Sequence, residues 1–190
     1  MSWLIEREQL QQEARQFDKA VRLVSKNSWF WKAIAWVLFI VSFGQFNRDS
    51  FVNSFGTTIG HIQAYPESWT AAKVRALLPH EGRHTFQARV CGFGIHPMVG
   101  LPIMFLLYIF LVFPIYLAFF RLWFELDADR AAWRYALSKG TTAVNSIRLR
   151  AVGFAELLCT SAYTWTAPRK LAIWWFSRAA EKVIAEQKLS

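Results

Sequence analysis

Residues 101–120 are twenty consecutive residues without a charged side chain, and this segment constrains the fold of the chain most strongly. A helix needs about 20 apolar residues to cross the hydrocarbon core of a bilayer, so the segment is long enough to span a membrane. Residues 29–46 form a second apolar run with a cluster of tryptophans, and Lys32 near its start can extend its amine toward lipid headgroups. We therefore expect residues 29–46 to be a transmembrane anchor.

The composition also points to a membrane. Hydrophobic residues make up 54% of the chain, with ten Trp and 17 Phe, yet the formal net charge is +9. Apolar blocks separated by basic stretches are typical of membrane proteins. No basic helix with interleaved aromatic residues stands apart from the apolar blocks, which argues against a nucleic-acid partner. A lipid bilayer is thus one expected partner, while the oligomeric state is not predicted.

The remaining pattern is mainly helical. Residues 3–25 have the spacing of an amphipathic helix, which would lie on a membrane, on a partner or on the core of this protein. Residues 57–64 favour a short edge strand or hairpin, and residues 69–90 and 121–140 favour helices. Pro79 should kink the first of these two helices or restart it.

These elements predict a membrane-associated, mainly α fold with four parts. They are an amphipathic N-terminal helix (1–28), the anchor (29–46), a central domain (47–140) with an apolar insertion (101–120), and C-terminal helices (141–190), the last of them amphipathic.

The candidate chemistry lies in the sequence H-E-x-x-H, which His80, Glu81 and His84 form on the helix expected over 69–90. Residues i and i+4 share one face of a helix, so the two imidazoles can bind one metal ion. Glu81 can hold and deprotonate a water molecule at that ion. The alternative is a solvated helix face with two surface histidines.

A third ligand is available in the segment FELDAD. Glu125 and Asp129 are four residues apart on a predicted helix, so they share a face. Glu125 would supply the carboxylate ligand, and Asp129 could accept the free N–H of a liganding histidine. By itself this pair would equally be an exposed acidic patch.

The sequence TTIGHIQAYP precedes the motif helix and contains Ile59, Gly60 and His61. An exposed edge strand can pair with an extended peptide, so these residues are candidate substrate-binding positions. His61 and His96 are otherwise expected to be surface histidines.

Together, TTIGHIQAYP, LLPHEGRH and RLWFELDADRAA resemble the gluzincin metallopeptidases, and in particular the membrane-bound CAAX prenyl peptidases and their HtpX-like relatives. The resemblance covers residues 57–132, and it implies that the central domain (47–140) is a zincin-like catalytic domain. It implies Zn²⁺ as the cofactor, a glutamate third ligand, Glu81 as the general base and Asp129 as the orienting carboxylate. Arg134 and Tyr135 are the candidates for stabilising the oxyanion.

The motif and the apolar segment make conflicting demands. Two ordinary spans would separate His80 from Glu125 by about 30 Å, the thickness of the bilayer core, whereas zinc–ligand bonds are about 2 Å. Three arrangements remain open: residues 101–120 form a re-entrant hairpin, they form one long helix running into the Glu125 helix, or there is no zinc site. We favour the hairpin. It places the metal site on one face, most simply the cytoplasmic face of a bacterial inner membrane.

The expected function is a membrane-anchored zinc-dependent endopeptidase acting on a polypeptide. The alternative is a non-catalytic membrane structural or assembly subunit that retains a degenerate peptidase fold.

Overall fold

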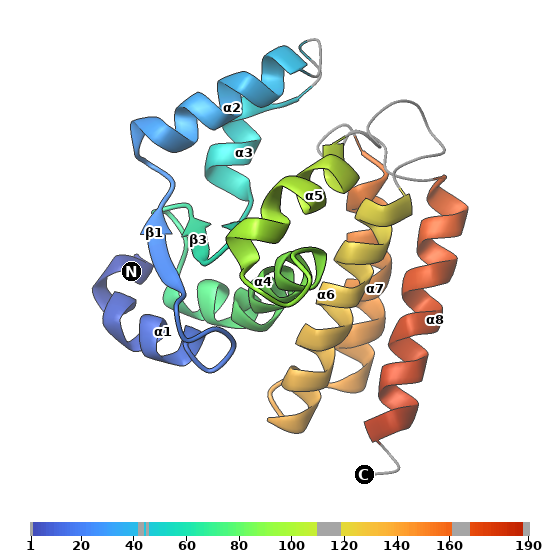
Figure 1. The fold of residues 1–190 in the computed structure, drawn as a ribbon. Helices are drawn as coiled ribbons and strands as arrows, with labels where there is room; N and C mark the ends of the chain where they lie inside the picture. Colours follow the sequence, from blue (N-terminus) through green and yellow to red (C-terminus); the bar gives the residue numbers. More distant parts are fainter. Residues whose placement is uncertain (1, 42–43, 45, 110–118, 161–167, 188–190) are drawn as a thin grey trace. The chain divides into compact units, whose positions relative to one another are not determined.

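The computed structural model describes residues 2–41, 44, 46–109, 119–160 and 168–187 (Figure 1). The chain divides into two compact units, Met1–Met104 and Phe105–Ser190, which are described separately. Helices dominate both units, and a three-stranded sheet lies in the first. The expectation of a mainly α fold with a short hairpin is confirmed at this level.

The first unit starts with a 3₁₀ turn, η1 (Trp3–Glu6), followed by α1 (Arg7–Ala14) and the strand β1 (Arg22–Ser25). The continuous helix expected over residues 3–25 is therefore wrong beyond Ala14.

Two local features explain why the helix ends early. The Asp18 side chain accepts a hydrogen bond from the backbone N–H of Ala20 at 3.2 Å, a local turn that competes with helix. Val21 and Leu23 are buried while Arg22 between them is exposed, which is the two-residue period of a strand.

The sheet has the strand order β1-β3-β2, in which β2 (Thr57–Ile59) is an edge strand. β3 (Ile62–Tyr65) pairs antiparallel with β2 and parallel with β1. Gly60 in the β2–β3 turn has φ 59°, a conformation that glycine adopts without strain.

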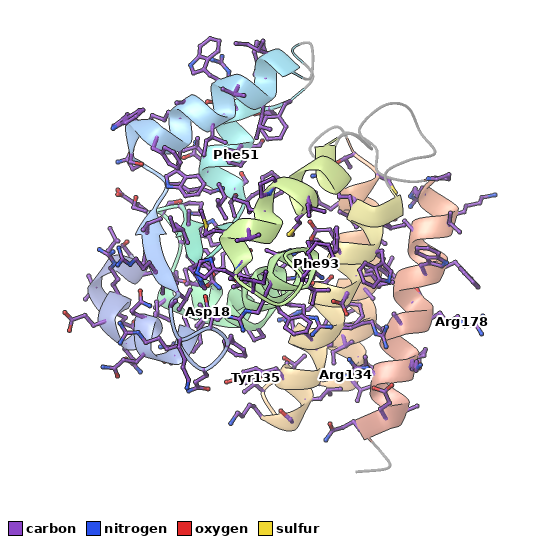
Figure 2. The ribbon with its side chains drawn as sticks, viewed as in Figure 1. Asp18, Phe51, Phe93, Arg134, Tyr135 and Arg178 are labelled. Carbon is purple, nitrogen blue, oxygen red and sulfur yellow. The ribbon has the colours of Figure 1, made fainter. Side chains whose placement is uncertain are left out.

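Helices α2 (Trp29–Val41) and α3 (Arg48–Ser54) pack on each other and share a small core that includes Trp31, Ala35 and Phe51, the last of which is labelled in Figure 2. Other large side chains of α2 are exposed, with Trp29 at 79% and Ile40 at 66%.

The expected membrane segments fall partly outside the described residues. Residues 42–43 and 45 of the predicted anchor (29–46) lie outside them, as do residues 110–118 of the predicted insertion (101–120). Within the part of the chain that the structure describes, no helix has both the length and the apolar character needed to cross a membrane. The re-entrant hairpin therefore stays a prediction.

Helix α4 (Ala71–Cys91) carries the H-E-x-x-H sequence and confirms the helix expected over 69–90. Its first turn is capped by the Thr70 hydroxyl, which accepts a hydrogen bond from the backbone N–H of Lys73 at 3.3 Å. Pro79 lies inside the helix rather than at a new start.

Helix α5 (Pro97–Ile109) begins close against the end of α4. A Cβ placed on Gly100 would lie 1.7 Å from the carbonyl oxygen of Ala88 and 2.3 Å from the backbone nitrogen of Gly92. Only glycine allows this approach, which fixes the loop between the two helices.

The second unit contains α6 (Phe119–Ser138), α7 (Val144–Leu158) and α8 (Arg169–Gln187), with α8 packed on both of the others (Figure 1). Its core combines residues from all three helices: Leu122, Trp133, Ile147, Ala151, Phe176 and Ile184. The helix expected over 121–140 is confirmed, and it ends in a Schellman motif at Gly140, whose φ is 63°.

The aromatic residues of α8 divide between the core and the surface. Phe176 is fully buried against Trp133, with ring centroids 6.3 Å apart, whereas Trp174 is 52% exposed. The helix is therefore amphipathic, but part of its aromatic content serves the core of this unit rather than an external surface.

Candidate metal centre

Helix α4 brings the two histidines of the motif together. His80 and His84 are one turn apart, and their Nε2 atoms are 3.1 Å from each other. Both are buried, with exposed fractions of 6% and 8%. The alternative of two solvated surface histidines is therefore wrong.

The tautomer of His84 follows from its neighbour Gln87. The Nδ1 atom of His84 lies 2.8 Å from Oε1 of Gln87. With the amide oxygen assigned to this contact, the oxygen can only accept, so Nδ1 donates. The lone pair of His84 is then on Nε2, the atom that faces His80, as a metal ligand requires.

Gln87 is a site residue that the sequence analysis missed. It stands three residues after His84 on the same helix, a spacing at which two side chains can meet. That spacing was the available signal, but a glutamine at i+3 is too common to be selected from sequence alone.

Glu81 is 5% exposed and is held by the edge strand β2. The hydroxyl of Thr58 on β2 donates a hydrogen bond of 2.6 Å to Oε2 of Glu81. A Cβ on Gly56 would lie only 2.7 Å from Oε1, so glycine makes room for the carboxylate.

A buried lysine accompanies this carboxylate. Lys26 is 0% exposed, donates to the carbonyl oxygen of Phe51 at 2.9 Å, and lies 3.9 Å from the centre of the Phe51 ring. Burial lowers the pKa of Lys26 to about 7, while the negative charge of Glu81 acts in the opposite direction. Burial, and secondarily Glu81, raises the pKa of Tyr65 well above its ordinary value. Neither residue was singled out from the sequence.

The third expected ligand, Glu125, is on α6 and is 4% exposed. Ligand atoms of His80, His84 and Glu125 all lie within 4.8 Å of one another, so this buried group could hold a metal ion. Its two imidazoles and one carboxylate are a donor set that fits zinc. Asp129 follows one turn after Glu125 and is half-buried.

The expected substrate-binding residues lie on and after the edge strand β2. Ile59 ends the strand, and the carbonyl oxygen of Gly60 accepts a hydrogen bond from the Thr85 hydroxyl at 2.9 Å. His61 contacts Asp18 and His96.

The oxyanion candidates Arg134 and Tyr135 are on α6 and are labelled in Figure 2. Arg134 is exposed, and its guanidinium binds Glu186 of α8 at 2.9 and 3.0 Å. The ring of Tyr135 lies 5.8 Å from Nζ of Lys139. These contacts do not test the oxyanion role, which stays a prediction for both residues.

No family model matches the chain, and neither the curated proteins nor the solved structures compared with it gave a match.

Proposed function

We propose that this protein is a zinc-dependent endopeptidase of the gluzincin type, associated with a membrane. The observation that carries the proposal is the buried group of His80, His84 and Glu125, together with Glu81 directly after the first histidine. Two imidazoles and one carboxylate are the ligands of the gluzincin centre, and three protein ligands leave a coordination position open, as catalytic zinc sites do.

The tautomer of His84 suits zinc binding. His84 donates from Nδ1 to Gln87, which orients its Nε2 lone pair toward the group. Asp129 is the proposed partner of the other histidine. A zinc ion held by the three ligands would polarise a peptide carbonyl and make water a better nucleophile.

Glu81 is the proposed general base. Its carboxylate would accept a proton from the attacking water and return it to the amine of the leaving peptide. The Thr58 hydroxyl fixes Oε2 at 2.6 Å, so the carboxylate is held by the strand that is also the proposed peptide-binding edge.

The proposed substrate is a polypeptide that adds to the edge of β2 as an extended strand. Ile59, Gly60 and His61 would border that peptide. A membrane-adjacent substrate is favoured by the apolar side chains exposed on α2, where Trp29 is 79% and Trp36 53% exposed. The proposed location is the cytoplasmic side of a bacterial inner membrane.

Metal analysis combined with peptide cleavage tests the proposal. Purified wild-type protein and Glu81→Gln should each contain about one zinc ion per chain more than His80→Ala and Glu125→Ala do. Glu81→Gln should lower the rate of peptide cleavage by roughly 10²–10⁴-fold, the usual contribution of a general base. Asp127→Ala, on the same helix as Glu125, is the matched control and should retain both zinc and activity.

If neither His80→Ala nor Glu125→Ala lowers a near-stoichiometric zinc content, the proposal is wrong. A second candidate, a non-catalytic membrane subunit, is favoured by the same exposed aromatic side chains of α2. Zinc that depends on His80 and Glu125, combined with no cleavage of any member of a peptide library, would support that second candidate.

A further inference from the structure

The two histidines outside the metal centre also form a pair. His61 follows β2 in the turn to β3, and His96 precedes α5. Their Nε2 atoms are 3.1 Å apart, the same separation as in the His80–His84 pair. The four histidines of the chain thus make two imidazole pairs, although His61 and His96 are 35 residues apart in sequence.

The separation of the two nitrogens fits a shared metal ion. Zinc–nitrogen bonds are about 2.05 Å, so two ligand nitrogens are roughly 2.9 Å apart at a right angle and roughly 3.3 Å apart at the tetrahedral angle. The 3.1 Å between the Nε2 atoms lies between these values. The distance between the two nitrogens is therefore the one that a shared ion requires.

A buried carboxylate orients the first ring. Nδ1 of His61 contacts Oδ2 of Asp18, whose side chain is 3% exposed. Asp18, which is labelled in Figure 2, is in turn fixed through Oδ1 by the backbone N–H of Ala20 at 3.2 Å, with the Arg89 guanidinium at 3.8 Å. A histidine that binds a metal usually donates its other ring N–H to such an acceptor, which fixes the tautomer with the lone pair on Nε2.

The second ring accepts a hydrogen bond from the start of α5, where the backbone N–H of Met98 donates to Nδ1 of His96 at 3.2 Å. The side chain of Met98 lies over Gly60, where an added Cβ would be 2.4 Å from the sulfur. His96 and Met98 therefore contact two consecutive residues of the β2–β3 turn. His96 is exposed and His61 half-buried, so an ion from solution can reach the pair.

We propose that His61 and His96 form a second transition-metal site, with Asp18 as the residue that positions His61. Imidazole pairs suit Zn²⁺, Cu²⁺ and Ni²⁺ rather than Mg²⁺ or Ca²⁺. The two nitrogens fill two coordination positions, and water or a substrate group takes the others. A bound ion joins the loop before α5 to the β2–β3 turn, next to the edge strand β2.

Metal binding at Nε2 of His96 should break one backbone hydrogen bond, and this loss can be detected by NMR. The backbone N–H of Met98 donates to Nδ1 of His96 at 3.2 Å, so in the neutral ring the proton is on Nε2. When an ion takes Nε2, that proton moves to Nδ1 and the Met98 N–H loses its acceptor. Zinc should therefore change the amide NMR signal of Met98 in the wild type but not in His96→Gln.

Zinc stoichiometry tests the site. The full-length protein is stripped with a chelator, dialysed against Zn²⁺ in the presence of excess Mg²⁺, and analysed for bound zinc. We expect two ions in the wild type, one in His96→Gln, one in His80→Ala/His84→Ala and none when the three substitutions are combined. Ile95→Ala, an exposed neighbour without a ligand atom, should bind as the wild type does. Asp18→Asn should weaken the second ion by about 10–100-fold, the usual effect of removing such a carboxylate.

The result separates this site from the proposed function. One ion in the wild type and none in His80→Ala/His84→Ala would overturn the second site and leave the peptidase proposal standing. If the wild type binds one ion, and that ion is retained in His80→Ala/His84→Ala but lost in His96→Gln, the second site is established. The same result would show that His80 and His84 do not bind zinc, which would contradict the proposed function. Equal zinc contents in the wild type and His96→Gln would overturn the second site, leaving the pair a hydrogen-bonded contact.

Discussion

The hydroxyl of Thr58 lies 2.6 Å from Oε2 of Glu81 and donates a hydrogen bond to it. This contact links the edge strand β2 to the residue proposed as general base. A peptide that adds to the edge of β2 would therefore bind to the same strand that holds the base, which couples the position of the scissile carbonyl to that of the carboxylate.

Replacing Thr58 by valine should slow peptide cleavage without loss of metal. The hydrogen bond is made to a charged group, which is worth about 1.5–3 kcal/mol and corresponds to roughly a 10–100-fold lower kcat/KM. The measurement is cleavage of any peptide that the wild type accepts, alongside zinc content. Thr58→Ser keeps the hydroxyl and should retain most of the activity; equal rates for Thr58→Val and the wild type would contradict this role.

Gln87 should control zinc affinity through His84. Gln87→Leu removes the acceptor 2.8 Å from Nδ1 and should weaken zinc binding by about 10–100-fold, because the ring loses its fixed tautomer and orientation. Titration against a competing chelator measures the affinity. Gln87→Glu retains an acceptor and serves as the control. An unchanged zinc affinity in Gln87→Leu would show that the contact does not orient the ligand.

The parts of the site that could be predicted from sequence are those set by helical spacing. His80 and His84 share a face because they are four residues apart, and Glu125 was selected because its carboxylate begins a second i, i+4 pair. The β2–β3 hairpin was also predictable, because the β-prone residues on both sides of Gly60 are followed by Pro66, which ends the strand.

The parts that could not be predicted depend on contacts between distant residues. β1 is a strand because it pairs in parallel with β3, about 40 residues later, while its own segment has the apolar spacing of a helix. Lys26 directly follows β1, its backbone N–H donates to the Tyr65 carbonyl at the end of β3, and its amine donates to the Phe51 carbonyl of α3. The His61–His96 contact likewise requires the α4–α5 loop to return to the hairpin.

The close approach of α5 to α4 predicts a strong effect at Gly100. Gly100→Ala would place a methyl group 1.7 Å from the Ala88 carbonyl oxygen, so the backbone must shift and the protein should lose about 3 kcal/mol or more of stability. Gly153→Ala is the control, because nothing lies within 4 Å of its added Cβ in α7. Alanine there should be neutral or stabilising by up to about 1 kcal/mol. The midpoint of thermal unfolding compares the two variants, and similar midpoints would contradict the predicted clash.

Because burial lowers the pKa of Lys26, the protein should become more stable as the pH rises from 7 to 10.5. Its pKa is about 7 in the folded protein and 10.5 when the side chain is solvated, so between these values the unfolded chain binds more protons. Stability must then rise with pH across this window. Below pH 7 both states carry the proton and the cost of burying the charge is present in full. Above 10.5 both states are neutral and the cost is absent.

The variant Lys26→Met removes this ionisation, so the pH dependence that Lys26 contributes is present in the wild type and absent from the variant. The free energy of unfolding of Lys26→Met minus that of the wild type should be constant below pH 7. It should then fall by about 1.4 kcal/mol per pH unit as the pH rises toward 10.5. Denaturant unfolding at intervals between pH 6 and 9.5 measures the difference. Lys26→Gln can still donate to the Phe51 carbonyl, so its offset should differ while its slope is the same. If the difference does not change with pH in either variant, the pKa of Lys26 in the folded protein is not lowered toward 7. Glu81 would then have no lysine beside it that titrates near neutral pH.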